Sequence, residues 1–362
     1  MSDVLALARP ELRSLVPYTP GAYEQDCIRL NANESPWRAP GDPTERGLNR
    51  YPPPRPWTLR RRLAEHYGVS EEELLVTRGS SEAIDVLIRG FCSAGHDRLV
   101  ICPPTFDMYR LYGAIQGVEI GRVPLLRSPD ETRDFALDAQ GVLASVNEAT
   151  KLIFLCSPNN PTGTSMRGSD VESICEAVTG RALVIIDEAY REFADAPSFR
   201  ELRSRFDHVV VLRTLSKFVS LAGVRCGAVI AAPVLIEFLG TVLPPYTFPT
   251  PSIELVLQAL TEDSLRVSRE RIALLRTERE RLAAALLRLP QVTKVWPSDA
   301  NFLLIETKDG ARFTEAARRG NILVRTFSNE TALEDCVRVT IGLPEHNDLL
   351  IRAVSTAERG NG

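Results

Sequence analysis

The chain has 362 residues, of which 44% are hydrophobic and 25% charged, and its formal net charge at pH 7 is −4. These values are ordinary for a soluble globular protein with room for two domains, and they leave no electrostatic footprint for nucleic acid or an anionic membrane. Seven cysteines are dispersed without a C-x-x-C pair and four histidines stand alone, so we expect reduced thiols, no metal site and a cytoplasmic location.

The N-terminal part of the chain carries no pattern for long regular elements. Residues 1–30 are expected to form an arm and part of a smaller domain, and they show no secretory signal. Residues 31–57 are rich in Pro, Asn and Gly, so they should run extended over a surface.

From residue 58 onward, helical and strand patterns alternate. The expected helices cover 58–68 and 81–92, and the expected strands cover 74–80, 98–104, 151–157, 182–190, 208–216 and 226–233. The strands are near-continuous runs of Val, Ile and Leu, which is typical of parallel strands buried on both faces. The pattern predicts an α/β fold whose large domain, residues 31–245, holds a mostly parallel sheet between helices. The longest apolar stretch, 227–243, contains Pro233 and Glu237 and is too short to cross a membrane.

A long amphipathic stretch, 264–289, places Ile272, Leu275, Leu282 and Leu286 on one helical face. We expect this helix to lead into a smaller C-terminal α/β domain, assigned to residues 246–362. Its expected strands cover 301–306, 322–327 and 336–342. Charged and apolar residues alternate in them, which predicts that one face of this second sheet is wetter.

Polar segments follow several predicted strands, and ligands of open α/β sheets bind beyond the carboxyl ends of the strands. The segment TRGSSEAI turns on Gly79 and enters a helix through Ser80 and Ser81. Backbone N–H groups at such a start favour an anion, so this is a candidate phosphate site. The alternative is that one serine only caps the helix.

Two further strand ends carry candidate polar groups. In CSPNNPTG the amide of Asn159 could face a cleft, and the alternative is that the segment is a turn alone. Asp187 closes an apolar strand and is followed by Tyr190. A buried carboxylate needs a cationic or hydrogen-bond donor partner, so the alternative role for Asp187 is a structural salt bridge or cap.

Lys217 lies just beyond the strand predicted at 208–216. A lysine in this position can form an imine with a carbonyl cofactor, and the alternative is a surface residue. Thr214, Ser216 and Arg225 would then converge on an anion, which again suggests phosphate. The motifs G-x-G-x-x-G and G-x-x-x-x-G-K-[ST] are absent, so dinucleotide and P-loop sites lack support.

The order of the motifs resembles that of fold-type I pyridoxal-phosphate (PLP) enzymes, and among them the histidinol-phosphate aminotransferase branch of the class II aminotransferases. The matching motifs, from about residue 15 to about 350, are NANESP, RYP, GSSEAI, PPTFDMY, SPNNPTG, IIDEAY, TLSKFVSLAGVRCG, NFLLIE, VRTF and VRVTIG. The resemblance implies transfer of the amino group of L-histidinol phosphate to 2-oxoglutarate in histidine biosynthesis.

The resemblance also implies roles for individual residues. Lys217 would hold PLP as an imine, and Asp187 would keep the pyridinium nitrogen protonated, which makes the ring an electron sink. The remaining implied cofactor contacts are Tyr190 and Asn159 at the phenolic oxygen, Phe106 on the ring face, and Ser80, Ser81, Thr214, Ser216 and Arg225 at the phosphate.

Substrate contacts and a partner subunit are implied as well. In CVRVTIG, Val337, Val339 and Ile341 share one face of the strand and Arg338 points the other way. The resemblance assigns Arg338 and Arg325 to the substrate phosphate or the oxo-acid carboxylate. It places Asn33 and either Tyr18 or Tyr23 of the arm near the substrate, and it lets Tyr51 reach the cofactor phosphate of the second subunit in an obligate homodimer.

Three other functions stay open on the sequence. Two are PLP enzymes on the same scaffold, an aromatic amino-acid aminotransferase and a phosphothreonine-type decarboxylase. The third is a PLP-binding regulatory module without turnover, which the complete set of implied cofactor contacts disfavours.

Overall fold

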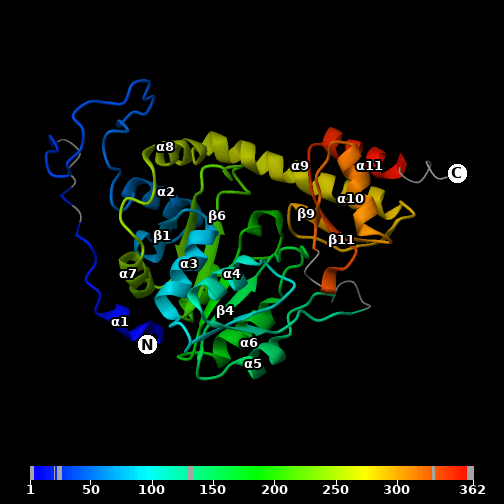
Figure 1. Ribbon diagram of the computed structural model, residues 1–362, viewed down its shortest axis with the longest axis horizontal. Coiled ribbons are helices and arrows are strands. Elements are labelled where there is room, and N and C mark those ends of the chain that lie inside the picture. Colours follow the sequence, from blue (N-terminus) through cyan, green and yellow to red (C-terminus); the bar gives the residue numbers. More distant parts are fainter. Residues whose placement is uncertain (1–3, 20, 23–26, 129–133, 328–330, 357–362) are drawn as a thin grey trace.

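The computed structural model describes residues 4–19, 21–22, 27–128, 134–327 and 331–356 (Figure 1). A large body surrounds a seven-stranded sheet, and a smaller body near the C-terminus contains a four-stranded sheet. The long helix α9 (Glu262–Leu287) runs from one body to the other, and the N-terminal segment loops out beside α2 (Trp57–Tyr67) and α8 (Thr250–Ala259) (Figure 1).

The large sheet has the strand order β1-β7-β6-β5-β4-β2-β3. Its strands are β1 (Leu74–Thr77), β2 (Arg98–Ile101), β3 (Glu119–Arg122), β4 (Thr150–Cys156), β5 (Leu183–Asp187), β6 (Val209–Thr214) and β7 (Gly227–Ile230). Strands β3, β2, β4, β5 and β6 are parallel, while β7 is antiparallel to β6 and β1. The predicted strands are confirmed, β3 was missed, and β7 reverses because the β6–β7 connection contains no crossover helix.

Strand β4 shows why the apolar runs are continuous. Leu152 and Phe154 face a core shared with α3, α4 and α7, whereas Ile153 and Leu155 face a core shared with α2, α5, α6 and α8. Both faces of the sheet are therefore dry.

The helices of the large body are α1 (Pro10–Arg13), α2 (Trp57–Tyr67), α3 (Ser80–Phe91), α4 (Met108–Gln116), α5 (Ala139–Ser145), α6 (Gly168–Ala177), α7 (Pro233–Val242) and α8 (Thr250–Ala259). Short 3-10 turns lie at Val4–Leu7, Glu71–Glu73, Arg191–Phe193, Phe199–Ser204 and Thr331–Leu333.

The small sheet is antiparallel, with the order β10-β11-β9-β8. Its elements are α9 (Glu262–Leu287), β8 (Val292–Val295), β9 (Phe302–Thr307), α10 (Gly310–Arg319), β10 (Arg325–Thr326), β11 (Cys336–Thr340) and α11 (Pro344–Thr356). The predicted bridging role of α9 is confirmed, because Ile272 packs in the large core and Leu282 and Leu286 pack in the small one.

The prediction of a wetter face on the small sheet is confirmed only in part: the face opposite the small core contains the half-buried Arg338 and the exposed Thr340, but the rest of it is covered. Val337 and Val339 face the small core, as predicted, but Phe302, Leu304 and Cys336 on the opposite face are buried against the large core. An alternating pattern indicates one wet face only when nothing packs on that face. Here the large body covers the part of the face that contains Phe302, Leu304 and Cys336.

The packing also differs from the predicted domain limits. Val4 and Leu7 pack with α3, α4 and α7 of the large body rather than with the small domain, and Ile253 of α8 belongs to the large core. We propose a division within α9 instead of at residue 245. Among the described residues, no helix combines the length and apolar character that crossing a membrane requires.

Candidate active site

The carboxyl ends of β4, β5 and β6 border a cleft of about 1040 Å³ that the small sheet closes on the other side. This is the edge of an open α/β sheet at which ligands bind. Eleven of the predicted site residues line it: Ser80, Ser81, Phe106, Asp187, Tyr190, Thr214, Ser216, Lys217, Arg225, Arg325 and Arg338. Arg110, Arg122 and Asn160, which were not predicted, line it too.

Lys217 is half-buried in this cleft, three residues beyond the end of β6. Its Nζ lies 5.6 Å from the ring centroid of Tyr190. Burial lowers the pKa of the Lys217 amine, and the positive charges of Arg338 and Arg225 lower it further. A larger neutral fraction makes the amine a better nucleophile and proton acceptor.

Asp187 ends β5 at the floor of the cleft and is only 2% exposed. The hydroxyl of Tyr109 donates to Oδ2 at 2.8 Å, and the backbone N–H of Ala189 donates to Oδ1 at 3.1 Å. Burial raises the pKa of Asp187 to about 6 in spite of these two donors. No described residue forms a salt bridge with Asp187, so its partners are donors rather than the cation of a structural pair.

No described side chain caps the N-terminus of α3. Gly79 occupies the N-cap position with φ 81°, and neither Ser80 nor Ser81 supplies the cap. The capping alternative is therefore not what the structure has, and both serines line the cleft instead. A Cβ on Gly79 would lie 2.8 Å from Nη2 of Arg225, so glycine is what lets this guanidinium approach the helix start.

Thr214 and Ser216 complete this polar corner. Their hydroxyls are 3.0 Å apart, and Nη1 of Arg225 donates to the Ser216 hydroxyl at 3.3 Å. The Arg225 backbone has φ 61°, in the left-handed region. Two hydroxyls, one guanidinium and the free N–H groups of a twelve-residue helix together form an anion-binding corner.

The structure differs from the sequence prediction at Asn159. This residue is buried, and its Nδ2 donates to Pro104 O at 2.9 Å and to the Thr162 hydroxyl at 2.8 Å, while its Oδ1 accepts from Thr105. Asn160 lines the cleft instead, where its Oδ1 accepts a hydrogen bond from Arg338. Successive side chains in the turn point in different directions, and the sequence gives no signal for which of two adjacent asparagines faces inward.

The two aromatic candidates are both at the cleft. The Tyr190 ring meets Phe302 edge to face with centroids 5.2 Å apart, and burial raises the pKa of the Tyr190 hydroxyl. Phe106 meets Tyr109 edge to face at 5.7 Å. Tyr109 was not foreseen as a functional residue, although it lies in the quoted motif PPTFDMY.

Arg325 and Arg338 are directly opposite each other in the β10–β11 pairing. Like charges in this position repel. The Arg338 guanidinium lies 5.3 Å from the Phe302 ring centroid, and burial lowers its pKa, with Arg325 adding to the effect. Neither arginine forms a salt bridge with a described residue, so the pair presents uncompensated positive charge to the cleft.

Three predicted contacts lie elsewhere in the single chain. Tyr51 is 51% exposed and packs on Tyr246, Asn33 is exposed, and Tyr18 is 69% exposed; none of them lines the cleft. Tyr23 lies outside the described residues. The sequence offers no signal for this separation, since it depends on how the arm runs over the surface.

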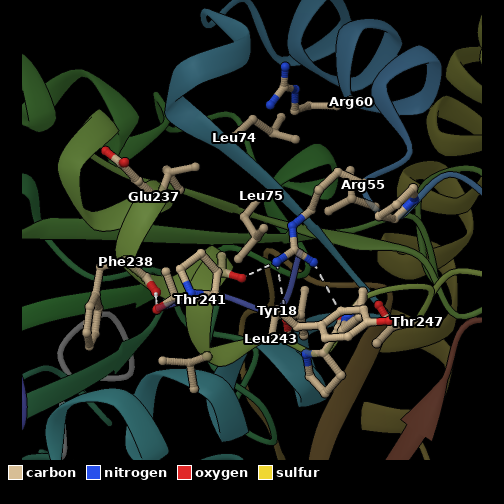
Figure 2. Close-up of a pocket in the computed structure, with 18 of the residues that line it drawn as sticks. Tyr18, Arg55, Arg60, Leu74, Leu75, Glu237, Phe238, Thr241, Leu243 and Thr247 are labelled. Atoms are coloured by element: carbon tan, nitrogen blue, oxygen red, sulfur yellow. Dashed lines mark hydrogen bonds between the residues drawn. The ribbon is translucent and has the colours of Figure 1, made fainter. Parts of the chain in front are cut away.

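Tyr18 borders a second cavity, of about 960 Å³, between the arm and α7 (Figure 2). Arg55 projects into it, but its guanidinium donates to the carbonyl oxygens of Gly240 and Leu243 at the end of α7. That arginine is therefore occupied in capping a helix. Within the described part of the chain, no group of three or more His, Cys, Asp or Glu side chains could hold a metal ion.

Comparison with known proteins gives consistent results. The model of the family "Aminotransferase class I and II" matches residues 26–354. The chain is 40% identical to histidinol-phosphate aminotransferase of Xanthomonas axonopodis pv. citri over 360 residues, which cover 99% of this chain and 98% of that protein. It is 42% identical to the enzyme of the same name from Xylella fastidiosa over 352 residues, covering 96% and 95%.

Among solved structures, the histidinol-phosphate aminotransferase of Clostridium acetobutylicum is similar with a TM-score of 0.77, covering 86% of this chain and 91% of that one. The sequence identity of this pair is 20%, so the match establishes the shared fold.

Proposed function

Because the chain belongs to the class I and II aminotransferase family, we propose that it transfers the amino group of L-histidinol phosphate to 2-oxoglutarate in histidine biosynthesis, with PLP as the cofactor. The observation that carries the proposal is one cleft that contains a buried carboxylate without a cationic partner, Asp187, and a half-buried amine, Lys217. The fold-type I architecture is shared with solved enzymes of this name.

The residues of the cleft fit PLP. Asp187 offers a buried negative charge to a pyridinium nitrogen, and the corner of Ser80, Thr214, Ser216 and Arg225 offers donors to a phosphate. When bound, PLP supplies the electron sink that stabilises a carbanion at the substrate Cα. The aldehyde of PLP would be held by the amine of Lys217.

The chain's own residues then have separate tasks. Asp187 would hold a proton on the ring nitrogen, because its carboxylate is buried and has no cationic partner among the described residues. The amine of Lys217 would also move a proton at the substrate Cα, a role that its lowered pKa suits. Tyr190 lines the cleft beside the amine of Lys217. We assign the hydrogen bond to the phenolic oxygen of PLP to Asn160 in place of Asn159, since only Asn160 lines the cleft.

The paired arginines support the choice of substrates. Arg338 and Arg325 place two positive charges opposite each other without an acidic partner among the described residues, an arrangement that a phosphate or carboxylate would stabilise. Both substrates are anions. The single carboxylate of L-phenylalanine carries one negative charge, whereas the phosphate of L-histidinol phosphate is close to a dianion at neutral pH and 2-oxoglutarate has two carboxylates. Phenylalanine would therefore leave one of the two arginine charges unmatched, which disfavours the aromatic amino-acid alternative.

The proposal includes a homodimer with composite sites. Tyr51 is exposed and remote from the cleft of its own chain, which suits a residue that reaches the second subunit. Ile28, Leu30 and Trp37 of the same segment are largely exposed apolar side chains that a second copy would cover. We also place the protein in the cytoplasm, a location that suits six buried thiols.

The first experiment records the visible absorption spectrum of the purified protein with PLP, before and after L-histidinol phosphate is added. We expect a cofactor band that the donor changes and 2-oxoglutarate restores. Lys217→Ala should lose both the band shift and the turnover. A clear preference for L-phenylalanine over L-histidinol phosphate would overturn the substrate assignment, and wild-type turnover by Lys217→Ala would overturn the mechanism.

The second experiment mixes two inactive variants, Lys217→Ala and Tyr51→Ala. If Tyr51 completes the partner's site, each mixed dimer contains one site with both native residues, and random mixing should restore about a quarter of the wild-type activity. Activity that stays at the level of the separate variants contradicts the composite site, provided that co-purification of differently tagged variants shows that the subunits have exchanged.

A further inference from the structure

Tyr109 of α4 is the only described side chain that donates a hydrogen bond to Asp187. The bond is 2.8 Å long and links residues 78 positions apart in the sequence. We propose that Tyr109 is a positioning residue, whose hydroxyl orients the Asp187 carboxylate toward the ring nitrogen of PLP and keeps that carboxylate ionised. The inference rests on the proposed function of the cleft.

The geometry fixes the phenol from both sides. The Tyr109 ring stacks on Phe154 of β4, with centroids 4.8 Å apart and planes 14° apart, and it meets Phe106 edge to face. The side chain is fully buried. Because neighbours hold the ring in place, the hydroxyl cannot follow the carboxylate if Asp187 turns, and the hydrogen bond therefore selects one carboxylate orientation.

The carboxylate of Asp187 can accept more hydrogen bonds than the two that it receives from the protein. Each carboxylate oxygen can accept about two hydrogen bonds. Oδ2 accepts one from Tyr109 and Oδ1 accepts one from the backbone of Ala189, so acceptor sites remain on the side that faces the cleft. Without the Tyr109 bond, Oδ2 would be buried and unpaired until a ligand reached it.

Burial and several neighbouring groups oppose the ionisation of Asp187, and the hydrogen bond from the Tyr109 hydroxyl offsets them in part. Burial of Asp187 opposes ionisation, and the neighbouring carboxylate of Glu188 opposes it too. The other titratable groups that interact with Asp187 are Cys156 of β4 and Tyr190, both of which also favour a neutral carboxyl when they ionise. Among the described residues, only the donors Tyr109 and Ala189 favour the carboxylate, and the Tyr109 hydroxyl is the donor that a side-chain substitution can remove.

The test is Tyr109→Phe, which keeps the ring contacts and deletes one oxygen. A hydrogen bond to a buried charge is strong enough that its loss should weaken PLP binding about tenfold. Because the neutral carboxyl becomes favoured, the acidic limb of the pH profile of kcat/KM should move up by about one pH unit. The pH midpoint of the bound cofactor's absorption spectrum should move with it. Tyr112→Phe is the matched control, since that ring lies on the same helix against the apolar core.

Two further measurements separate positioning from general stability. In the Asp187→Asn background, Tyr109→Phe should have little additional effect on PLP affinity, because the two residues act as a unit. Replacement of Tyr109 by fluorotyrosine, a more acidic donor of nearly the same shape, should move the spectral midpoint down. The inference would be overturned if Tyr109→Phe bound PLP as tightly as the wild-type protein and kept the same spectral midpoint. Additive effects of the two substitutions in the double variant would overturn it too. Failure of the wild-type protein to bind PLP would instead contradict the proposed function.

Discussion

Asp134 ties the small body to the large one, and its replacement by asparagine should cost stability. The side chain is 2% exposed, and Oδ2 accepts hydrogen bonds from Lys294 Nζ at 2.8 Å and from Trp296 Nε1 at 2.7 Å. Oδ1 accepts from Arg127 at 2.9 Å. Lys294 lies in β8 of the small sheet, whereas Asp134 and Arg127 belong to the large body. The contact therefore bridges the two bodies.

The size of the effect on stability follows from the lowered pKa of the Asp134 carboxyl group. Burial alone would raise its pKa, but the bonds from Lys294, Trp296 and Arg127 outweigh burial and lower it from 3.8 to about 2. That difference corresponds to about 2 kcal/mol of folding free energy at neutral pH. Since the folded-state pKa lies below the unfolded value, the contribution is complete above the unfolded pKa of 3.8 and is lost as the pH falls toward 2.

Urea denaturation of the PLP-loaded protein measures this contribution. Asp134→Asn should lower the free energy of unfolding by about 2 kcal/mol, equally at pH 5 and pH 8, and the difference from wild type should shrink below about pH 4. Asp348→Asn is the matched control, because its ion pair with Arg281 is partly exposed, with 40% and 44% of the two side chains accessible, and should contribute less than about 1 kcal/mol. A loss from Asp134→Asn no larger than that of the control, or one that changes between pH 5 and 8, would refute the reasoning.

Three other predictions test the cleft. Asn160→Ala should weaken PLP binding about tenfold with little loss of stability, whereas Asn159→Ala should destabilise the fold by about 1–3 kcal/mol because it leaves buried partners unpaired; equilibrium dialysis and urea denaturation distinguish the two. Arg338→Lys keeps the charge but loses the planar fork, so kcat/KM for both substrates should fall at least about tenfold; equal rates with wild type would count against an anion contact. Gly79→Ala should weaken PLP binding because its Cβ would meet a guanidinium at 2.8 Å. Gly180→Ala, also at positive φ but with nothing within 4 Å, should leave PLP affinity unchanged.

Much of the site was predictable because it depends on strand ends. In a parallel sheet the carboxyl ends of all strands lie at one edge, so Asp187 at the end of β5 and Lys217 just after β6 were expected to meet. The same reasoning brought the start of α3 to this edge. Arg225 precedes β7 and reaches the same edge only because β7 is antiparallel to β6, which the strand-end argument did not predict. The alternation in VRVTIG correctly separated Val337 and Val339 from Arg338 because side chains of a strand alternate between its two faces.

Other features depend on contacts that no local pattern encodes. The direction of β7 follows from how the chain returns after β6, and an apolar run has the same appearance in either direction. The burial of Phe302 and Leu304 required a second body to cover the sheet face that their alternation suggested was wet. The positions of Tyr51 and Tyr18 depend on the course of an arm with few regular elements.

The sequence by itself determined the order of the strands along the chain, the chemical groups at their ends and the family of the protein, because these are written in local periodicity and in the succession of motifs. Only the tertiary structure decided that Asn160 rather than Asn159 faces the cleft, and that Tyr109 reaches Asp187 across 78 residues. The physical reason is that a side chain's partners depend on which elements pack together, and packing is a property of the whole chain rather than of any segment.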